Sequence, residues 1–297
     1  MFPRLRLLLL CCGIPALIGL AITAIVGMLV EGTANYEIQF RAAVDGRALT
    51  CGHQIDGIGE ARISVSLVDF RFTVSNVELI RYDGKIFSLA LEQDGIWQIG
   101  NVANLDLEDA SGSCVQGTPV TRREVRGSAP KGNYRGVRFV LGGPDGVNLA
   151  DPAIAPLLNT GRVQQEEEGN HHALRIELAT VVADEGAAPL TSQATRTVFR
   201  IRRRACPPNT DSGVQCGADG ANQVTLNDVQ PNRHDVIAEI GGLISESIVG
   251  QDASSRTRVC EPTSVDSTCV EALQRLGFAG GGKIGRAHLF FFAQARR

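Results

Sequence analysis

The stretch that decides the fold is Ile63-Ser-Val-Ser-Leu-Val-Asp-Phe-Arg-Phe-Thr-Val-Ser-Asn-Val-Glu-Leu-Ile80. From Ile63 to Leu67 every second residue is apolar, which is the pattern of a strand that buries one face. The alternation changes phase at Phe70 and again at Val77. We therefore expect a long strand interrupted by β-bulges or a bend, rather than one straight and regular strand.

Turn signals and further strand patterns surround this stretch. Asp83-Gly84 and Asp94-Gly95 are typical of β-hairpins. Helical spacing of apolar residues is limited to 235–249 and 270–276. The sequence predicts an all-β fold, an antiparallel β-sandwich or barrel-like ectodomain with one or two short helices. We expect its other strands at residues 36–40, 86–91, 96–99, 136–141, 174–178, 195–201, 224–226 and 288–292.

An uncharged apolar segment precedes the β-rich part. It runs from Leu7 to Val30 and follows Arg4 and Arg6. Its 24 residues can span a bilayer and exceed the roughly 7–15 residues of a usual signal-peptide core. The basic flank should stay in the cytoplasm. We therefore expect a transmembrane helix that anchors the chain, with cleavage after Gly32-Thr-Ala34 as the alternative.

The remaining residues, 31–297, lack a linker that would divide them, so we expect a single extracytoplasmic domain after the N-terminal segment 1–30. This domain should lie outside the cytoplasm, anchored or secreted. None of the 32 acidic residues lies in the first 30 positions, so the acidic balance belongs to the domain. Such a balance argues against a nucleic-acid partner, which needs a basic surface. The basic run Arg200-Ile-Arg-Arg-Arg204 is either a solvated strand end or a docking patch.

Eight cysteines are present, and Cys11 and Cys12 lie inside the apolar segment. An even number beyond it, in an exported domain, indicates disulfides rather than free thiols. The alternative, a thiolate metal site, lacks support because no Cys-x-x-Cys occurs. Many pairings are possible for six cysteines, and the economical one is sequential: Cys51 with Cys114, Cys206 with Cys216, and Cys260 with Cys269.

Motifs of the common enzyme classes are absent. The sequence contains no Gly-x-Ser-x-Gly elbow, no Gly-x-x-x-x-Gly-Lys phosphate loop and no His-Glu-x-x-His. We expect a protein that is not itself an enzyme. The only methionines are Met1 and Met28, which excludes a thioether copper ligand in the domain. Histidines from separate strands could bind copper or zinc, although a core or surface role is the ordinary alternative for each one.

Residues 40–151 resemble the MbnP-like family of periplasmic, copper-associated proteins, also described as the four-Cys members of a metallo-mystery pair. The resemblance weakens beyond this region but continues through the last two cysteines. It is carried by Cys51-Gly52, Gly57-Ile-Gly59, Asp69-Phe-Arg-Phe72, Val74-Ser-Asn-Val-Glu-Leu79, Gln93-Asp-Gly-Ile-Trp-Gln98, Leu105-Asp-Leu-Glu-Asp109, Cys114, Gly117-Thr-Pro119, Gly132-Asn-Tyr-Arg-Gly-Val-Arg-Phe139 and Asn148-Leu-Ala-Asp-Pro152.

The resemblance implies a β-rich periplasmic protein that binds copper and works with a di-haem cytochrome peroxidase-like partner. In the family this partner oxidises a tryptophan of a Trp-x-Trp segment to kynurenine. The equivalent stretch here is Gln165-Glu-Glu-Glu-Gly-Asn-His-His-Ala173, with Gln165 and Glu167 in place of the tryptophans. Trp97 matches a different position, and we expect it in the core.

Two hypotheses follow. The first is a divergent, disulfide-stapled member of this family that binds copper. Its candidate ligands are His53, His171, His172 and His288. The second is a membrane-tethered structural or binding module that kept the scaffold and lost the metal site, as the rewritten segment 165–173 suggests.

Overall fold

The computed structural model describes residues 32–58, 62–115, 117, 119–142, 172–181, 195–202, 223–243, 256–260, 267–276 and 290–296. Within these ranges there is no helix with the length and hydropathy needed for a membrane span. The apolar segment 7–30, the expected membrane anchor, lies outside the described residues.

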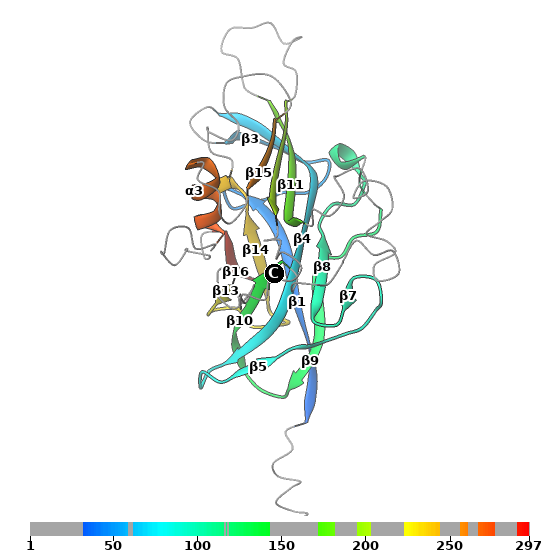
Figure 1. Cartoon of the computed structure of the whole chain (residues 1–297), viewed down its shortest axis with the longest axis vertical. Helices are drawn as coiled ribbons and strands as arrows, with labels where there is room; N and C mark the ends of the chain where they lie inside the picture. Colours follow the sequence, from blue (N-terminus) through cyan, green and yellow to red (C-terminus); the bar gives the residue numbers. More distant parts are fainter. Residues whose placement is uncertain are drawn as a thin grey trace, which may run out of the picture.

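Strand β4, Ile63–Arg81, runs along the long axis of the molecule as one continuous strand of 19 residues (Figure 1). The expected irregularities are present as register shifts in its pairing with neighbouring strands. Both of its faces are largely buried, which explains why the simple alternation of the sequence breaks after Leu67. This strand holds the larger sheet together because five other strands pair with it directly.

The larger sheet has ten strands, and its main order is β13-β10-β4-β11-β12-β15. Strands β3, β5 and β8 also pair with β4, and β7 pairs with β8. The bounds are β3 Gln54–Ile58, β5 Ile86–Ser88, β7 Gln98–Ile99, β8 Val102–Asp106, β10 Tyr134–Leu141, β11 His172–Val181, β12 Thr195–Arg202, β13 Gln223–Leu226 and β15 Arg256–Cys260.

The smaller sheet has six strands in the order β16-β14-β1-β9-β6, with β2 paired to β1. In the described part of the chain neither sheet closes into a barrel, so the sandwich is the correct form of the two expected ones. The bounds are β1 Thr33–Val44, β2 Arg47–Ala48, β6 Ala90–Leu91, β9 Glu124–Pro130, β14 His234–Glu239 and β16 Phe291–Ala295.

Aromatic rings from both sheets meet in the core. Phe40 of β1 contacts Phe72 of β4 and Phe139 of β10, with ring centroids 5.4 and 5.8 Å apart. Phe291 of β16 lies 5.4 Å from Phe139 in an edge-to-face arrangement. All four side chains are buried. These contacts join strands from the two ends of the chain, and each such ring buries a large apolar area.

Residues 235–243 correct the helix expected at 235–249. They form β14 and a 3-10 turn, η3 Gly241–Leu243, while residues 244–249 lie outside the described ranges. β14 pairs with β1 on one side and β16 on the other, and its residues 235–238 are buried. A strand buried on both faces shows no alternation, so isoleucines at helical spacing gave a false helical signal.

Two further expectations need correction. Asp94-Gly95 does not close a hairpin, because β6 before it belongs to the smaller sheet and β7 after it to the larger one. The sheets are also not purely antiparallel, since β1 pairs with β14 and β12 with β15 in parallel. The turn Asp83-Gly84 does connect the antiparallel strands β4 and β5, as predicted.

One α-helix is described, α3 Ser267–Arg275, which overlaps the short helix expected at 270–276. The disulfide Cys260–Cys269 ties it to β15. The disulfide Cys51–Cys114 joins the start of the domain to η1, Gly112–Cys114. Both were expected from sequential pairing, and the third, Cys206–Cys216, falls outside the described residues.

Candidate functional site

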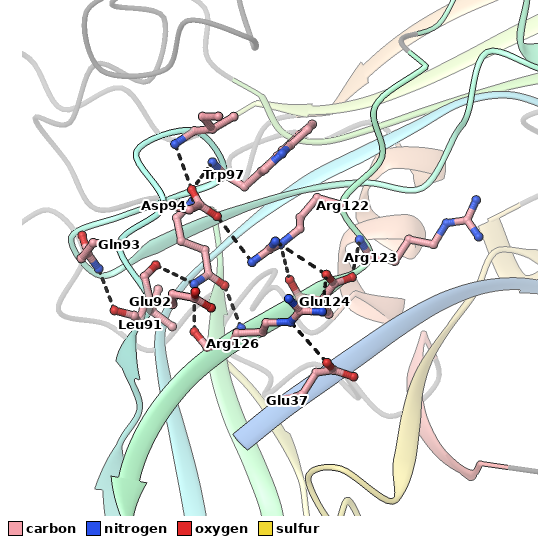
Figure 2. Close-up of polar contacts among 12 residues, drawn as sticks. Glu37, Leu91, Glu92, Gln93, Asp94, Trp97, Arg122, Arg123, Glu124 and Arg126 are labelled. Carbon is pink, nitrogen blue, oxygen red and sulfur yellow. Dashed lines mark hydrogen bonds and ion pairs between the residues drawn. The ribbon is translucent and has the colours of Figure 1, made fainter. Parts of the chain in front are cut away.

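The loop between the two sheets is organised by one carboxylate (Figure 2). Oδ1 of Asp94 accepts hydrogen bonds from the backbone N–H groups of Ile96, Trp97 and Gln98, at 2.9, 2.7 and 2.9 Å. Burial opposes ionisation here, but the three N–H groups and Arg122 outweigh it and lower the pKa of Asp94. An ionised Asp94 therefore fixes the shape of this turn.

Two glutamines join the same loop to the strands around it. Gln98 donates to the carbonyls of Glu92 and Arg126 and accepts from the Arg126 N–H, each at 2.8 Å. Gln93 bonds to both backbone groups of Gly100: its side-chain amide donates to the Gly100 carbonyl and accepts from the Gly100 N–H. Gln98 is fully buried, so its three hydrogen bonds satisfy groups that water cannot reach.

Trp97 is 8% exposed and belongs to the buried residues, as expected. Its backbone N–H is held by Asp94, and its carbonyl accepts from the N–H of Asn104 in β8. The order Asp-Gly-Ile-Trp-Gln in this chain is thus explained by the turn. Asp94 accepts the N–H groups, glycine takes φ +73° at position 95, and the indole packs inward.

Ion pairs extend from this loop across the smaller sheet (Figure 2). Arg122 lies 3.4 Å from Asp94 Oδ2 and 3.6 Å from Glu124 Oε1. Arg126 continues the row to Glu124 at 3.2 Å and to Glu37 at 3.3 Å. The Arg126 side chain is 48% exposed, so water screens its pairs and they hold orientation more than they stabilise.

A second charged group lies on the larger sheet, and its acids are buried. We name it the buried ion cluster: Asp69 and Arg71 of β4, Asp106 of β8, Glu108 after it, Arg175 and Glu177 of β11, and Arg196 of β12. The side chains of its four acids are at most 5% exposed. Strand pairing brings these residues together, because Arg71 of β4 lies opposite Asp106 of β8 and opposite Arg175 of β11 in the register of the sheet.

The arginines connect the acids of this cluster. Arg71 Nε lies 2.9 Å from Asp69, and its Nη2 lies 3.4 Å from Glu108. Arg175 lies 2.8 Å from Asp69 and 3.0 Å from Glu177. Burial raises the pKa of Asp69, and the attraction of Arg71 and Arg175 only partly offsets it. The two arginines thus join acids of β4, β8 and β11 into one network of ion pairs.

Glu108 also lies beside a disulfide. Its carboxylate and the sulfurs of Cys51 and Cys114 lie within 4.8 Å of one another, and in the described residues this is the one group with three potential metal ligands. The two sulfurs are bonded to each other, however, and a disulfide offers no thiolate. In this oxidised form the group does not fit a copper or zinc site.

Glycines allow the chain to pack closely around this disulfide. Gly52 has φ +73° and Gly112 φ +50°, and a Cβ on Gly112 would overlap the backbone of Gly52. A Cβ on Gly117 would overlap the Glu108 carboxylate. The glycines next to the cysteines are therefore explained by close approach rather than by ligand binding.

The candidate histidines are not all brought together. His53 is exposed and precedes β3, where Gln54 pairs with Ser66, and Ser66 pairs with Ala179 of β11. The backbone of His172 opens the same strand, seven residues from Ala179. Seven residues of strand span roughly 23 Å, and metal–nitrogen bonds are about 2 Å long. The register therefore gives no support to a single ion held by His53 and His172 together.

Of the other histidines, His171 and His288 lie outside the described residues. His234 was not a candidate, and its Nδ1 accepts the backbone N–H of Gln230 at 2.9 Å. The buried ion cluster was missed by sequence reasoning. A signal was present, since the charged residues Asp69 and Arg71 lie on either side of Phe70 in the middle of the long strand, but their partners come from strands more than 30 residues away.

Fold and site together define a disulfide-bonded β-sandwich with a buried ionic cluster and a rigid Asp-Gly-Ile-Trp-Gln loop. The family model described as MbnP matches residues 33–243. The chain therefore belongs to the MbnP family. Among solved structures it is similar to MbnP from Methylosinus trichosporium, with a TM-score of 0.62 and 22% identity. That match covers 90% of this chain and all of the other, and it supports the fold. No curated protein matches the chain.

Proposed function

We propose that this chain is an exported, copper-binding member of the MbnP family that is not itself an enzyme. The match of the family model over residues 33–243 carries the proposal. The two described disulfides support an oxidising compartment, the periplasmic side of the inner membrane. Residues 7–30 anchor the chain there, and a di-haem cytochrome peroxidase-like protein is its partner, as in the family.

The metal ligands are best sought at the start of β11. The described cysteines all form disulfides, so they offer no thiolate ligand. His53 lies far from His172 along the paired strands β4 and β11. His171 and His172 are adjacent in sequence and follow the acidic run 166–168. We propose one of these two as the first ligand, because neighbouring side chains at the start of a strand point to opposite faces, with His288 as a further candidate. Neutral imidazole is a good ligand for both oxidation states of copper.

Copper titration of the full-length chain in detergent tests this site. The His171→Ala/His172→Ala double variant should lose binding, whereas His53→Ala serves as the matched control and should bind like the natural chain. Binding should weaken below about pH 6, where histidines take up protons. Affinity that is weaker than micromolar in the natural chain contradicts the copper proposal. Binding that survives in the double variant but is lost in His53→Ala would place the site at His53, beside the Cys51–Cys114 disulfide.

One observation favours a second function. Gln165 and Glu167 stand where the family has two tryptophans, and neither side chain offers an indole that can be oxidised to kynurenine. We therefore do not extend that oxidation to this chain. The alternative is a membrane-tethered structural or binding module without metal. Metal analysis of the protein isolated from its native membrane distinguishes the two, because stoichiometric copper excludes the alternative.

A further inference from the structure

The hairpin between β4 and β5 presents two large side chains to solvent. Tyr82 is 58% exposed and Ile86 is 42% exposed. They are two of the four large hydrophobic residues that are exposed within the described ranges. A single exposed apolar side chain is ordinary, but two on the same hairpin tip form a small apolar surface.

This tip is held rigidly. The guanidinium of Arg81 stacks 4.4 Å above the Phe87 ring and 5.6 Å from the Tyr134 ring. The backbone closes the turn through Arg81 N–H and the Lys85 carbonyl at 2.9 Å. The Tyr82 hydroxyl accepts a hydrogen bond from Gln230 at 2.9 Å. The exposed side chains are therefore preorganised.

The hairpin is also joined to the point where β1 begins. Lys131, in the turn between β9 and β10, donates its N–H to Gly32 O at 2.7 Å. Its carbonyl accepts from Arg81 Nη2 at 2.6 Å. The start of β1, this turn and the hairpin thus form one unit, and they lie at the same end of the molecule in Figure 1. We name this unit the β1 end, residues 32–33, 81–87 and 131–135.

The β1 end is basic although the whole chain has a net charge of −3. Lys85, Lys131 and Arg135 are exposed, and the exposed acid among the residues of the β1 end is Asp83, 3.7 Å from Lys85. Exposed lysine and arginine around tyrosine and an aliphatic side chain match the headgroup region of a bilayer. There cations meet lipid phosphates and amphipathic rings accumulate.

The sequence before β1 brings this end close to a membrane. The uncharged segment 7–30 ends two residues before β1, and only Glu31 and Gly32 lie between them. Two residues span at most about 7 Å. We propose that the β1 end is a membrane-facing surface whose Tyr82 and Ile86 enter the headgroup layer while Lys85 and Lys131 contact lipid phosphates. This inference rests on the anchoring proposed above.

Tryptophan fluorescence of the full-length chain in vesicles tests the surface. Ile86→Trp adds a reporter to the natural Trp97, which is buried and supplies a constant signal. Val115→Trp is the matched control, since Val115 is 70% exposed and follows Cys114, whose sulfur lies 3.3 Å from the Leu67 carbonyl. From Leu67 to the hairpin, β4 covers roughly 45 Å of strand.

Brominated lipids should quench the added emission of Ile86→Trp at least twofold and leave that of Val115→Trp unchanged. Adding Lys85→Glu and Lys131→Glu should reduce the quenching, most strongly in vesicles with anionic phosphatidylglycerol. Equal quenching of both reporters in a chain that resists alkaline extraction overturns the surface but not the anchor. Release of the chain by alkaline extraction overturns the anchor, and the inference with it.

Discussion

Two charged regions, one on each sheet, differ in how far water reaches them. On the smaller sheet Arg126, Glu37 and Glu124 form ion pairs that water reaches, whereas on the larger sheet Asp69, Glu108 and Glu177 are buried. Exposed pairs are screened and contribute little. A buried acid must keep its partner because the charge has no water to replace it. The same residue types therefore act as surface features in the first region and as part of the core in the second.

The largest expected effect comes from breaking the buried ion cluster at Arg71. Arg71→Met keeps the side-chain volume but removes the guanidinium shared by Asp69, Asp106 and Glu108. We expect a loss of about 3–5 kcal/mol in the free energy of unfolding. Urea unfolding followed by Trp97 fluorescence measures it. A loss below about 1 kcal/mol would show that water or rearranged groups solvate the acids.

An intermediate effect is expected at Asp94, which is partly exposed. Asp94→Ala leaves three backbone N–H groups without their acceptor and should cost about 2 kcal/mol at pH 7. Because the pKa of Asp94 is lowered on folding, its contribution is present above the ordinary value of 3.8 and is lost as pH falls through the folded pKa. The natural chain and the variant should therefore converge in acid unfolding curves. A constant difference at all pH values contradicts this assignment.

The smallest effect is expected at Arg126. Arg126→Met removes its pairs with Glu37 and Glu124, and we expect a change of at most about 1 kcal/mol. The change should vanish in about 1 M salt, where charges further apart than roughly 3 Å are screened. The Arg71→Met effect should persist under the same conditions. Equal salt sensitivity of the two variants would contradict the difference proposed between the exposed ion pairs of Arg126 and the buried ion cluster.

Local sequence was sufficient for elements whose residues determine their own shape. The irregular strand β4, the Asp83-Gly84 hairpin, the second short helix and two disulfides were all predicted. Strand β9 was missed because, of its inward-facing residues Val125, Gly127 and Ala129, only Val125 is a strong strand former. Residues 235–239 were misread as helix because burial on both faces removes the period of two.

The candidate site was predictable only in part. The burial of Trp97 was predicted, but the hairpin expected at Asp94-Gly95 is wrong and the capping of three N–H groups by Asp94 was not predicted. The buried ion cluster depends on register between β4, β8 and β11, and no local pattern encodes which arginine meets which acid. Register also separates His53 from His172, which composition and spacing could not reveal.

The parallel pairing of β1 with β14 has a consequence for how the chain folds. It places Gln39 opposite Asp235, and β16, at residues 291–295, completes the same sheet. A ribosome makes β1 long before either of these two neighbours. The smaller sheet therefore cannot be complete until β16 has been made, and Phe40 lacks its contact with Phe291 until then. Such non-local closure is slow, so this sheet is completed only after β16 has been made.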